Sequence, residues 1–227
     1  MRRMPLIAAA VVLAGLSTLA THAQFIGQRV HDDFKDTSIL RPPAGSEVAI
    51  VVFEDLGCPL CARAHPIEVQ AAQQYYVPLL RYDFPLAQHI WTFNGAVCAR
   101  YLQDKVSPKL ADQFRSDVFS SQRLIDNKDD LQQFTRRWMQ QHGQQMPFVM
   151  DPSGSLAARV KADYDLGLRL NVTATPTLVV VTRNNYQIVC GKNNLVDPTQ
   201  LVPILRAAIA QTTAAPAKPA AKPRAKQ

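Results

Sequence analysis

A continuous apolar segment followed at once by two closely spaced cysteines constrains this chain more than any other feature. The segment Val48–Phe53 is wholly apolar and mostly β-branched. Such a run is typical of a strand that is buried on both faces in the middle of an α/β sheet. Cys58 and Cys61 follow it, and Pro59 suits the first turn of a helix, where its missing N–H costs nothing. The sequence therefore predicts a buried strand that leads two cysteines to the start of a helix.

Two cysteines at a helix start can form a redox-active disulfide. The N-terminus of a helix carries about half a positive charge and free N–H groups, which favour a thiolate. Comparable sites lower the pKa of a cysteine from about 8.5 to roughly 3.5–7. We therefore expect Cys58 to be the exposed nucleophile and Cys61, one turn inside the helix, to be the buried resolving thiol.

Metal binding is the rival interpretation of the same residues. Cys58, Cys61 and His65 have a spacing that could ligate zinc or copper, as in a metal-binding chaperone. A structural zinc site needs a fourth ligand, and the sequence has no second Cys-x-x-Cys and no His-x-His pair. We therefore predict no metal. A purely structural disulfide is also disfavoured, because closing so short a loop gains little entropy.

The rest of the central chain alternates strand and helix signals. A second strand is expected at Val77–Phe84, and the pattern from about residue 89 to 170 is helical almost throughout. Strands are then expected at Thr177–Thr182 and Tyr186–Cys190, and a final helix is expected after Asp197. This order predicts an α/β fold that a helical block interrupts. Pro176 directly precedes the third strand, a position that tolerates a missing N–H.

Both ends of the chain differ in composition from its centre. Arg2 and Arg3 precede a short apolar run, Ile7–Ala20, and small residues up to Ala23, the pattern of a cleaved signal peptide. Residues 212–227 contain only Ala, Pro, Thr, Lys, Arg and Gln, which is typical of a disordered tail. Removing the six basic residues of these ends from the formal net charge of +7 leaves +1. The charge is thus no argument for nucleic-acid binding.

The two remaining cysteines, Cys98 and Cys190, leave two alternatives open. They could be small buried apolar residues, or they could form a structural disulfide that joins the helical block to the sheet. The even number of cysteines and an oxidising compartment favour the disulfide, but sequence alone does not give their separation.

Several separate motifs together resemble the DsbA-like branch of the thioredoxin superfamily. The similarity covers Glu47 to Ala210. The motifs that carry it are Val51-Val52-Phe53-Glu54-Asp55-Leu56-Gly57-Cys58-Pro59-Leu60-Cys61, Tyr82-Asp83-Phe84-Pro85-Leu86 with His89, and Thr175-Pro176-Thr177. The helical block matches the helical insertion of that branch, which thioredoxin itself lacks.

The resemblance implies a thioredoxin fold with a helical insertion between the second strand and the cis-proline strand. Its division would be a signal peptide at 1–23, an N-terminal arm at 24–46, a thioredoxin-fold domain at 47–88 and 171–211, the insertion at 89–170 and the tail at 212–227. It implies that Cys58 is the nucleophile, that Cys61 resolves, and that the Thr175–Pro176 bond is cis. The substrate groove would consist of Pro59, Leu60, Thr175 and Pro176.

The resemblance further implies a periplasmic or otherwise exported protein thiol:disulfide oxidoreductase without a bound cofactor. It would act on protein or peptide thiols and disulfides. A membrane quinone-linked thiol oxidase, DsbB-like or vitamin-K-epoxide-reductase-like (VKOR-like), would regenerate its disulfide. No dimerisation segment is evident, so we expect a monomer.

Two positions depart from the family pattern and leave the direction of electron flow open. Many relatives carry an acid where this chain has Val52, although Glu54 and Asp55 lie nearby. Strongly oxidising relatives often carry histidine where this chain has Leu60, so a positive charge beside Cys58 is missing. Oxidation of cysteine pairs is the leading hypothesis, and a disulfide reductase or isomerase remains an alternative.

Overall fold

A four-stranded sheet forms the centre of the protein. The computed structural model describes residues 40–191 and 195–213. The strands are β1 (Val48–Glu54), β2 (Leu79–Asp83), β3 (Thr177–Thr182) and β4 (Tyr186–Ile188), in the order β2-β1-β3-β4. Strand β1 pairs parallel with β2 and antiparallel with β3, and every residue of β1 is buried. The α/β class and the doubly buried strand are confirmed.

Helices cover both faces of this sheet. Ile50 and Val52 of β1 face α1 (Pro59–Tyr75) and α6 (Leu201–Thr213) in one apolar cluster. Val51 and Phe53, on the opposite face, pack against α5 (Ser155–Arg169) in another. This alternation is the period-2 geometry of a strand. Because helices cover both faces, β1 needs apolar side chains on both of them.

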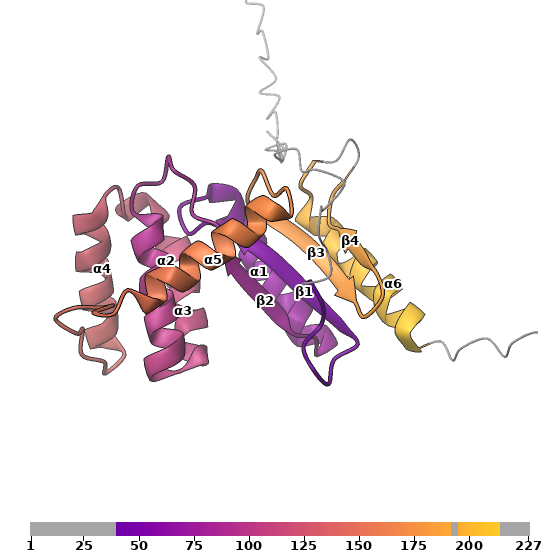
Figure 1. Ribbon diagram of the computed structural model, residues 1–227, viewed down its shortest axis with the longest axis horizontal. Helices are drawn as coiled ribbons and strands as arrows, with labels where there is room; N and C mark the ends of the chain where they lie inside the picture. The colour runs from indigo at the N-terminus through magenta and orange to yellow at the C-terminus, as the bar shows by residue number, and fades with distance from the viewer. Residues whose placement is uncertain (1–39, 192–194, 214–227) are drawn as a thin grey trace, which may run out of the picture.

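Three further helices, called the side helices below, lie beside the sheet rather than on it (Figure 1). They are α2 (Thr92–Tyr101), α3 (Pro108–Ser121) and α4 (Lys128–Gln141). A π-helical turn, Leu102–Val106, follows α2, and a 3-10 turn, Gln122–Leu124, follows α3. Their shared core is rich in aromatic side chains, with the ring of Phe114 edge-on to that of Trp138 at 5.1 Å between centroids.

Buried ion pairs join these helices to the ends of β1 and β2. Arg115 of α3 donates to Glu54 at 3.0 Å and lies 2.8 Å from Asp83. Arg100 of α2 donates to Asp83 at 2.7 Å and also pairs with Asp163 of α5. Breaking such a pair by removing one partner typically costs about 3–5 kcal/mol. The network therefore fixes the helices relative to the sheet edge.

Some sequence-based expectations need correction. Strand β2 is shorter than the predicted Val77–Phe84, and β4 ends at Ile188, two residues before Cys190, which forms only an isolated bridge with Val196. The structure shows no bond between Cys98 and Cys190, as it shows none between Cys58 and Cys61, so the disulfide between Cys98 and Cys190 stays a prediction. They pack in different apolar clusters, Cys98 among the side helices and Cys190 beside the sheet.

The predicted signal peptide, the N-terminal arm up to residue 39, and the tail from residue 214 lie outside the described residues. Within the described part of the chain, no helix is both long enough and apolar enough to cross a membrane.

Candidate active site

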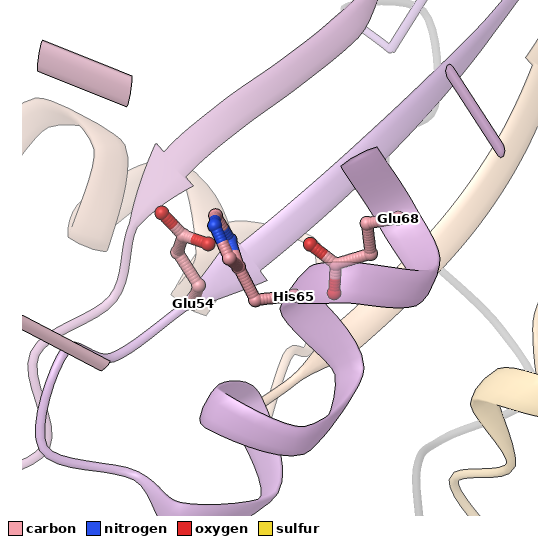
Figure 2. Close-up of side chains that lie close together, drawn as sticks. All are labelled: Glu54, His65 and Glu68. Atoms are coloured by element: carbon pink, nitrogen blue, oxygen red, sulfur yellow. The ribbon is translucent and has the colours of Figure 1, made fainter. Parts of the chain in front are cut away.

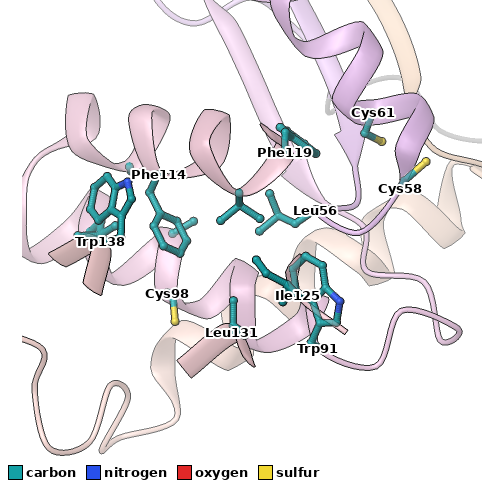
Figure 3. Close-up of a cluster of buried hydrophobic side chains, with 14 of the residues drawn as sticks. Leu56, Cys58, Cys61, Trp91, Cys98, Phe114, Phe119, Ile125, Leu131 and Trp138 are labelled. Atoms are coloured by element: carbon teal, nitrogen blue, oxygen red, sulfur yellow. The ribbon is translucent and has the colours of Figure 1, made fainter. Parts of the chain in front are cut away.

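The two cysteines lie where β1 passes into α1. Cys58 occupies the N-cap position of α1 with extended backbone angles (φ −79°, ψ 120°), and Pro59 is in the first turn, as predicted. Cys61 lies one turn further along the same helix. Figure 3 shows both sulfurs at one end of the apolar cluster that the side helices build. The helix start and the cluster together hold the pair in place.

The turn before Cys58 is organised by the buried carboxylate of Asp55. Its Oδ1 accepts from the Gly57 N–H at 2.8 Å, and its Oδ2 accepts from the Leu86 N–H at 2.8 Å. His89 Nδ1 lies 2.7 Å from the same Oδ2. A Cβ on Gly57 would lie 2.6 Å from Thr92 Cγ2, so this position needs glycine. Asp55 thus joins the turn Leu56–Cys58, called the cysteine turn below, to the chain that follows β2.

The segment before β3 lies directly against Cys58. The Thr175–Pro176 bond is cis, as the resemblance implied. Cys58 Sγ donates to the Thr175 carbonyl oxygen at 3.2 Å, although the two residues are 117 positions apart. The Thr175 hydroxyl is buried and has no hydrogen-bond partner among the described residues. Because a hydroxyl rotates freely, it can donate to the sulfur once Cys58 is a thiolate.

The two thiols have pKa values displaced in opposite directions. Hydrogen bonds from the Cys61 side chain, from Thr175 and from the N–H groups at the start of α1 lower the pKa of Cys58 to about 6, against an opposing effect of burial. Burial, and next the proximity of Cys58, raise the pKa of Cys61 well above its ordinary value. The Asp55 N–H points at Cys61 Sγ at 3.5 Å. Such a pair can hold one stable thiolate at neutral pH, on Cys58.

The expectation of an exposed nucleophile is wrong, because Cys58 is only 3% exposed and Cys61 1%. The segment around Thr175 covers the Cys58 sulfur, a contact between distant parts of the chain that no local pattern reveals. Leu60 supplies no positive charge beside Cys58. Neutral hydrogen-bond donors are sufficient to lower the pKa of Cys58.

The structure does not assemble the metal site considered for Cys58, Cys61 and His65. Among the described residues, the group close enough to share an ion is Glu54, His65 and Glu68, which includes neither thiol (Figure 2). Its ligand atoms lie within 4.8 Å of one another. His65 instead contacts the ring of Phe119, with 4.9 Å between ring centroids.

The cluster of Glu54, His65 and Glu68 does not suit a divalent cation either. Both oxygens of Glu54 already accept from guanidinium groups, from Arg81 at 2.9 Å and from Arg115 at 3.0 Å. Arg81 also lies 3.7 Å from Glu68. Burial, and next the charge of Glu54, raise the pKa of Glu68 to about 8, so it holds a proton at neutral pH. Arginine and this proton supply the positive charge that an ion would bring.

Comparison with known proteins identifies the family. The thioredoxin family model matches residues 41–188, which include β1, both cysteines, the side helices and β3. The chain belongs to the thioredoxin family. Together with the Cys-x-x-Cys pair at the helix start, this membership makes the protein a thiol–disulfide oxidoreductase. No curated protein sequence matches the chain.

Solved structures of DsbA proteins share the fold of this chain. Wolbachia pipientis α-DsbA1 aligns with a TM-score of 0.58 and 15% identity, over 75% of this chain and 92% of that one. Pseudomonas aeruginosa DsbA2 aligns with 0.54 and 18%, over 76% and 92%. The oxidoreductase NmDsbA1 of N. meningitidis aligns with 0.52 and 15%, over 81% and 90%. The predicted thioredoxin fold with a helical insertion is confirmed.

Two contributors to the site are not indicated by any local sequence pattern. Gln122 donates from its side chain to backbone carbonyls of the cysteine turn, and Arg115 reaches Glu54 from 61 residues away. A glutamine after a helix and an arginine within one carry no distinctive local signal. Only the predicted start and end of the helical block could have suggested that its residues reach the cysteines.

Proposed function

We propose that this protein oxidises cysteine pairs in protein or peptide substrates through a Cys58–Cys61 disulfide. The observation that carries the proposal is the low pKa of Cys58, about 6. A thiolate that is stable at neutral pH favours the reduced form of the protein and so makes its disulfide more oxidising. Relative to an ordinary cysteine, the effect at pH 7 is about 1.4 kcal/mol, or roughly 30 mV for two electrons.

The chemistry proceeds by two thiol–disulfide exchanges. A substrate thiolate attacks Cys58 Sγ of the disulfide, a mixed disulfide forms, and the sulfur of Cys61 leaves and takes up a proton. The second substrate thiolate then attacks the substrate sulfur of the mixed disulfide, and Cys58 leaves as a thiolate. The substrate loses two electrons and gains a disulfide, and the protein gains the same two electrons as a dithiol.

Four residues around the sulfur are proposed to contact the substrate. Pro59 is exposed beside Cys58, whereas Leu60, Thr175 and Pro176 are buried. The hydrogen bond from Cys58 to the Thr175 carbonyl supports this assignment, because it puts the segment before β3 next to the reacting sulfur. An extended substrate segment that passes this edge would bring its own cysteine to Cys58.

The same chemistry supports a proposal for the compartment and the partners. Disulfide formation persists in oxidising compartments, and the N-terminal residues have the composition of a signal peptide cleaved near Ala23. We therefore propose an exported, periplasmic monomer. A membrane quinone-linked thiol oxidase, DsbB-like or VKOR-like, would accept its two electrons and restore the disulfide.

Oxidation of a reduced two-cysteine peptide tests this proposal. The oxidised protein should convert the peptide to its disulfide form with equal loss of its own disulfide. Cys58→Ser should abolish this reaction, and Cys61→Ser, loaded at Cys58 with an activated disulfide of a single-cysteine form of the peptide, should accumulate the mixed disulfide, detectable by mass spectrometry. Cys190→Ser is the matched control and should react as the wild type does.

The reductase or isomerase alternative gives a different result in the same experiment. If the equilibrium left the peptide reduced and the protein oxidised, the protein would act as a reductant. Full activity of Cys58→Ser would contradict any role of this pair.

A further inference from the structure

One side chain of the helical insertion is hydrogen-bonded to the cysteine turn. Gln122 is the first residue of the 3-10 turn Gln122–Leu124, directly after α3. Its Nε2 donates to the Leu56 carbonyl oxygen at 2.6 Å and to the Cys58 carbonyl oxygen at 3.0 Å. A side-chain amide has two N–H groups. Both are therefore used on the two carbonyls that flank Gly57.

The direction of these two carbonyls determines how the peptide units around Cys58 are oriented. The Cys58 carbonyl also accepts the Ala62 N–H at 3.1 Å, the hydrogen bond that closes the first turn of α1. The backbone N–H groups of Leu60 and Cys61 are among the donors that stabilise the Cys58 thiolate. A turn that is free to rotate about Gly57 would carry the sulfur away from these donors.

Apolar packing on both sides of Gln122 keeps its amide in place. Phe119, at the end of α3, and Ile125, after the 3-10 turn, belong to the same buried cluster as Leu56 and the two cysteines. Figure 3 shows Leu56 among Phe119, Ile125 and the cysteine turn. Gln122 is thus fixed by the insertion and bonded to the turn, which gives it the geometry of a clamp between the two.

We propose that Gln122 is a positioning residue for the redox reaction, whose amide holds the Leu56–Cys58 turn so that the Cys58 sulfur meets the N–H groups of α1. Through Gln122 the helical insertion then contributes to the oxidising strength of the disulfide by hydrogen bonds to the backbone alone. This inference rests on the proposed redox function of Cys58 and Cys61, and it deepens that function by naming what orients the nucleophile.

Two substitutions at Gln122 separate positioning from simple structural support. Gln122→Met keeps the length of the side chain but has no donor, and Gln122→Glu keeps its shape but turns carboxylate oxygens toward two carbonyl oxygens. Gln133→Met, at an exposed position of α4, is the control. The measurements on each full-length protein are the pH midpoint of thiolate absorbance, the equilibrium constant with glutathione, and the free energy of unfolding.

Gln122→Met should raise the pKa of Cys58 by about half a unit to one unit, the equivalent of one neutral hydrogen bond. At pH 7 the glutathione equilibrium should shift about 2.5-fold to 5.5-fold toward the oxidised protein, roughly 12–22 mV at about 30 mV per tenfold change. Gln122→Glu should shift both further in the same direction, and Gln133→Met should shift neither.

An unchanged midpoint and an unchanged equilibrium in both variants would overturn the inference, even if the proteins were less stable. If Gln122→Met does not fold, Gln122→Asn decides, because it keeps the amide but is one methylene shorter. Wild-type values of the midpoint and the equilibrium in Gln122→Asn would then contradict the positioning role. A shift of both in the direction expected for Gln122→Met would support it. If the wild-type cysteines did not equilibrate with glutathione at all, the proposed function itself would fail, a result distinct from equal values in wild type and variants.

Discussion

Replacing Cys61 by alanine removes the largest contribution to the low pKa of Cys58, the hydrogen bond from the Cys61 side chain. A hydrogen bond to a charged group is worth about 1.5–3 kcal/mol, and one pKa unit corresponds to about 1.4 kcal/mol. The pKa of Cys58 should therefore rise from about 6 by about one to two units. At pH 7 the thiolate fraction would fall from about nine-tenths to roughly one-quarter for a rise of about 1.5 units.

The observable is the midpoint of thiolate absorbance against pH rather than the alkylation rate at one pH. Intrinsic nucleophilicity rises with thiol pKa, with a Brønsted coefficient of about 0.4–0.5, so it offsets much of the lost thiolate fraction in a rate. Cys61→Ser is the matched control, because its hydroxyl retains a donor and should give a smaller shift. A midpoint near 6 in Cys61→Ala would refute the assignment of the Cys58 thiolate to its Cys61 partner.

Three substitutions away from the sulfurs test the buried network and the packing, each by urea unfolding. The raised pKa of Glu68, about 8, means that its contribution to stability is present below pH 4.5 and is lost as the pH rises toward 8. Glu68→Gln should therefore gain at least about 1 kcal/mol relative to wild type between pH 4.5 and 8.5. Arg115→Met should cost about 3–5 kcal/mol, because it leaves two buried carboxylates without their shared partner. Gly167→Ala should cost about 1–3 kcal/mol by overpacking, since the new Cβ would lie 2.5 Å from the Phe84 ring.

Each of these predictions has a result that contradicts it. For Glu68→Gln it is a stability difference that does not change with pH. For Arg115→Met it is a cost as small as that of Arg137→Met, an exposed control on α4 expected to lie within about 0.5 kcal/mol of wild type. For Gly167→Ala it is a gain of about 1 kcal/mol, the value that helix propensity alone would predict.

The sequence predicted those parts of the fold that local patterns determine. The apolar run Val48–Phe53, the proline after Cys58 and the Thr175–Pro176 pair all took their expected places. Each depends on backbone chemistry or on the periodicity of one segment. The family resemblance supplied the cis bond and the helical insertion, which periodicity alone could not.

Contacts between distant segments cannot be predicted from local patterns. The burial of Cys58 depends on Thr175, the pairing of Glu54 depends on Arg115, and the clamp on the cysteine turn depends on Gln122. Each partner belongs to another element, and each has an ordinary residue type for its local position. Their roles follow only from how the insertion packs against the end of β1.

The redox potential of the Cys58–Cys61 pair tests the central claim most directly. Known thiol–disulfide couples with nucleophile pKa values from about 3.5 to 7 span roughly −120 to −270 mV, so a pKa of about 6 corresponds to roughly −230 mV. Equilibration in glutathione buffers, followed by alkylation and mass mapping of the cysteines, should give one two-electron transition near that value, confined to Cys58 and Cys61. A transition that involves Cys98 or Cys190 instead, or no transition between about −100 and −300 mV, would contradict the account.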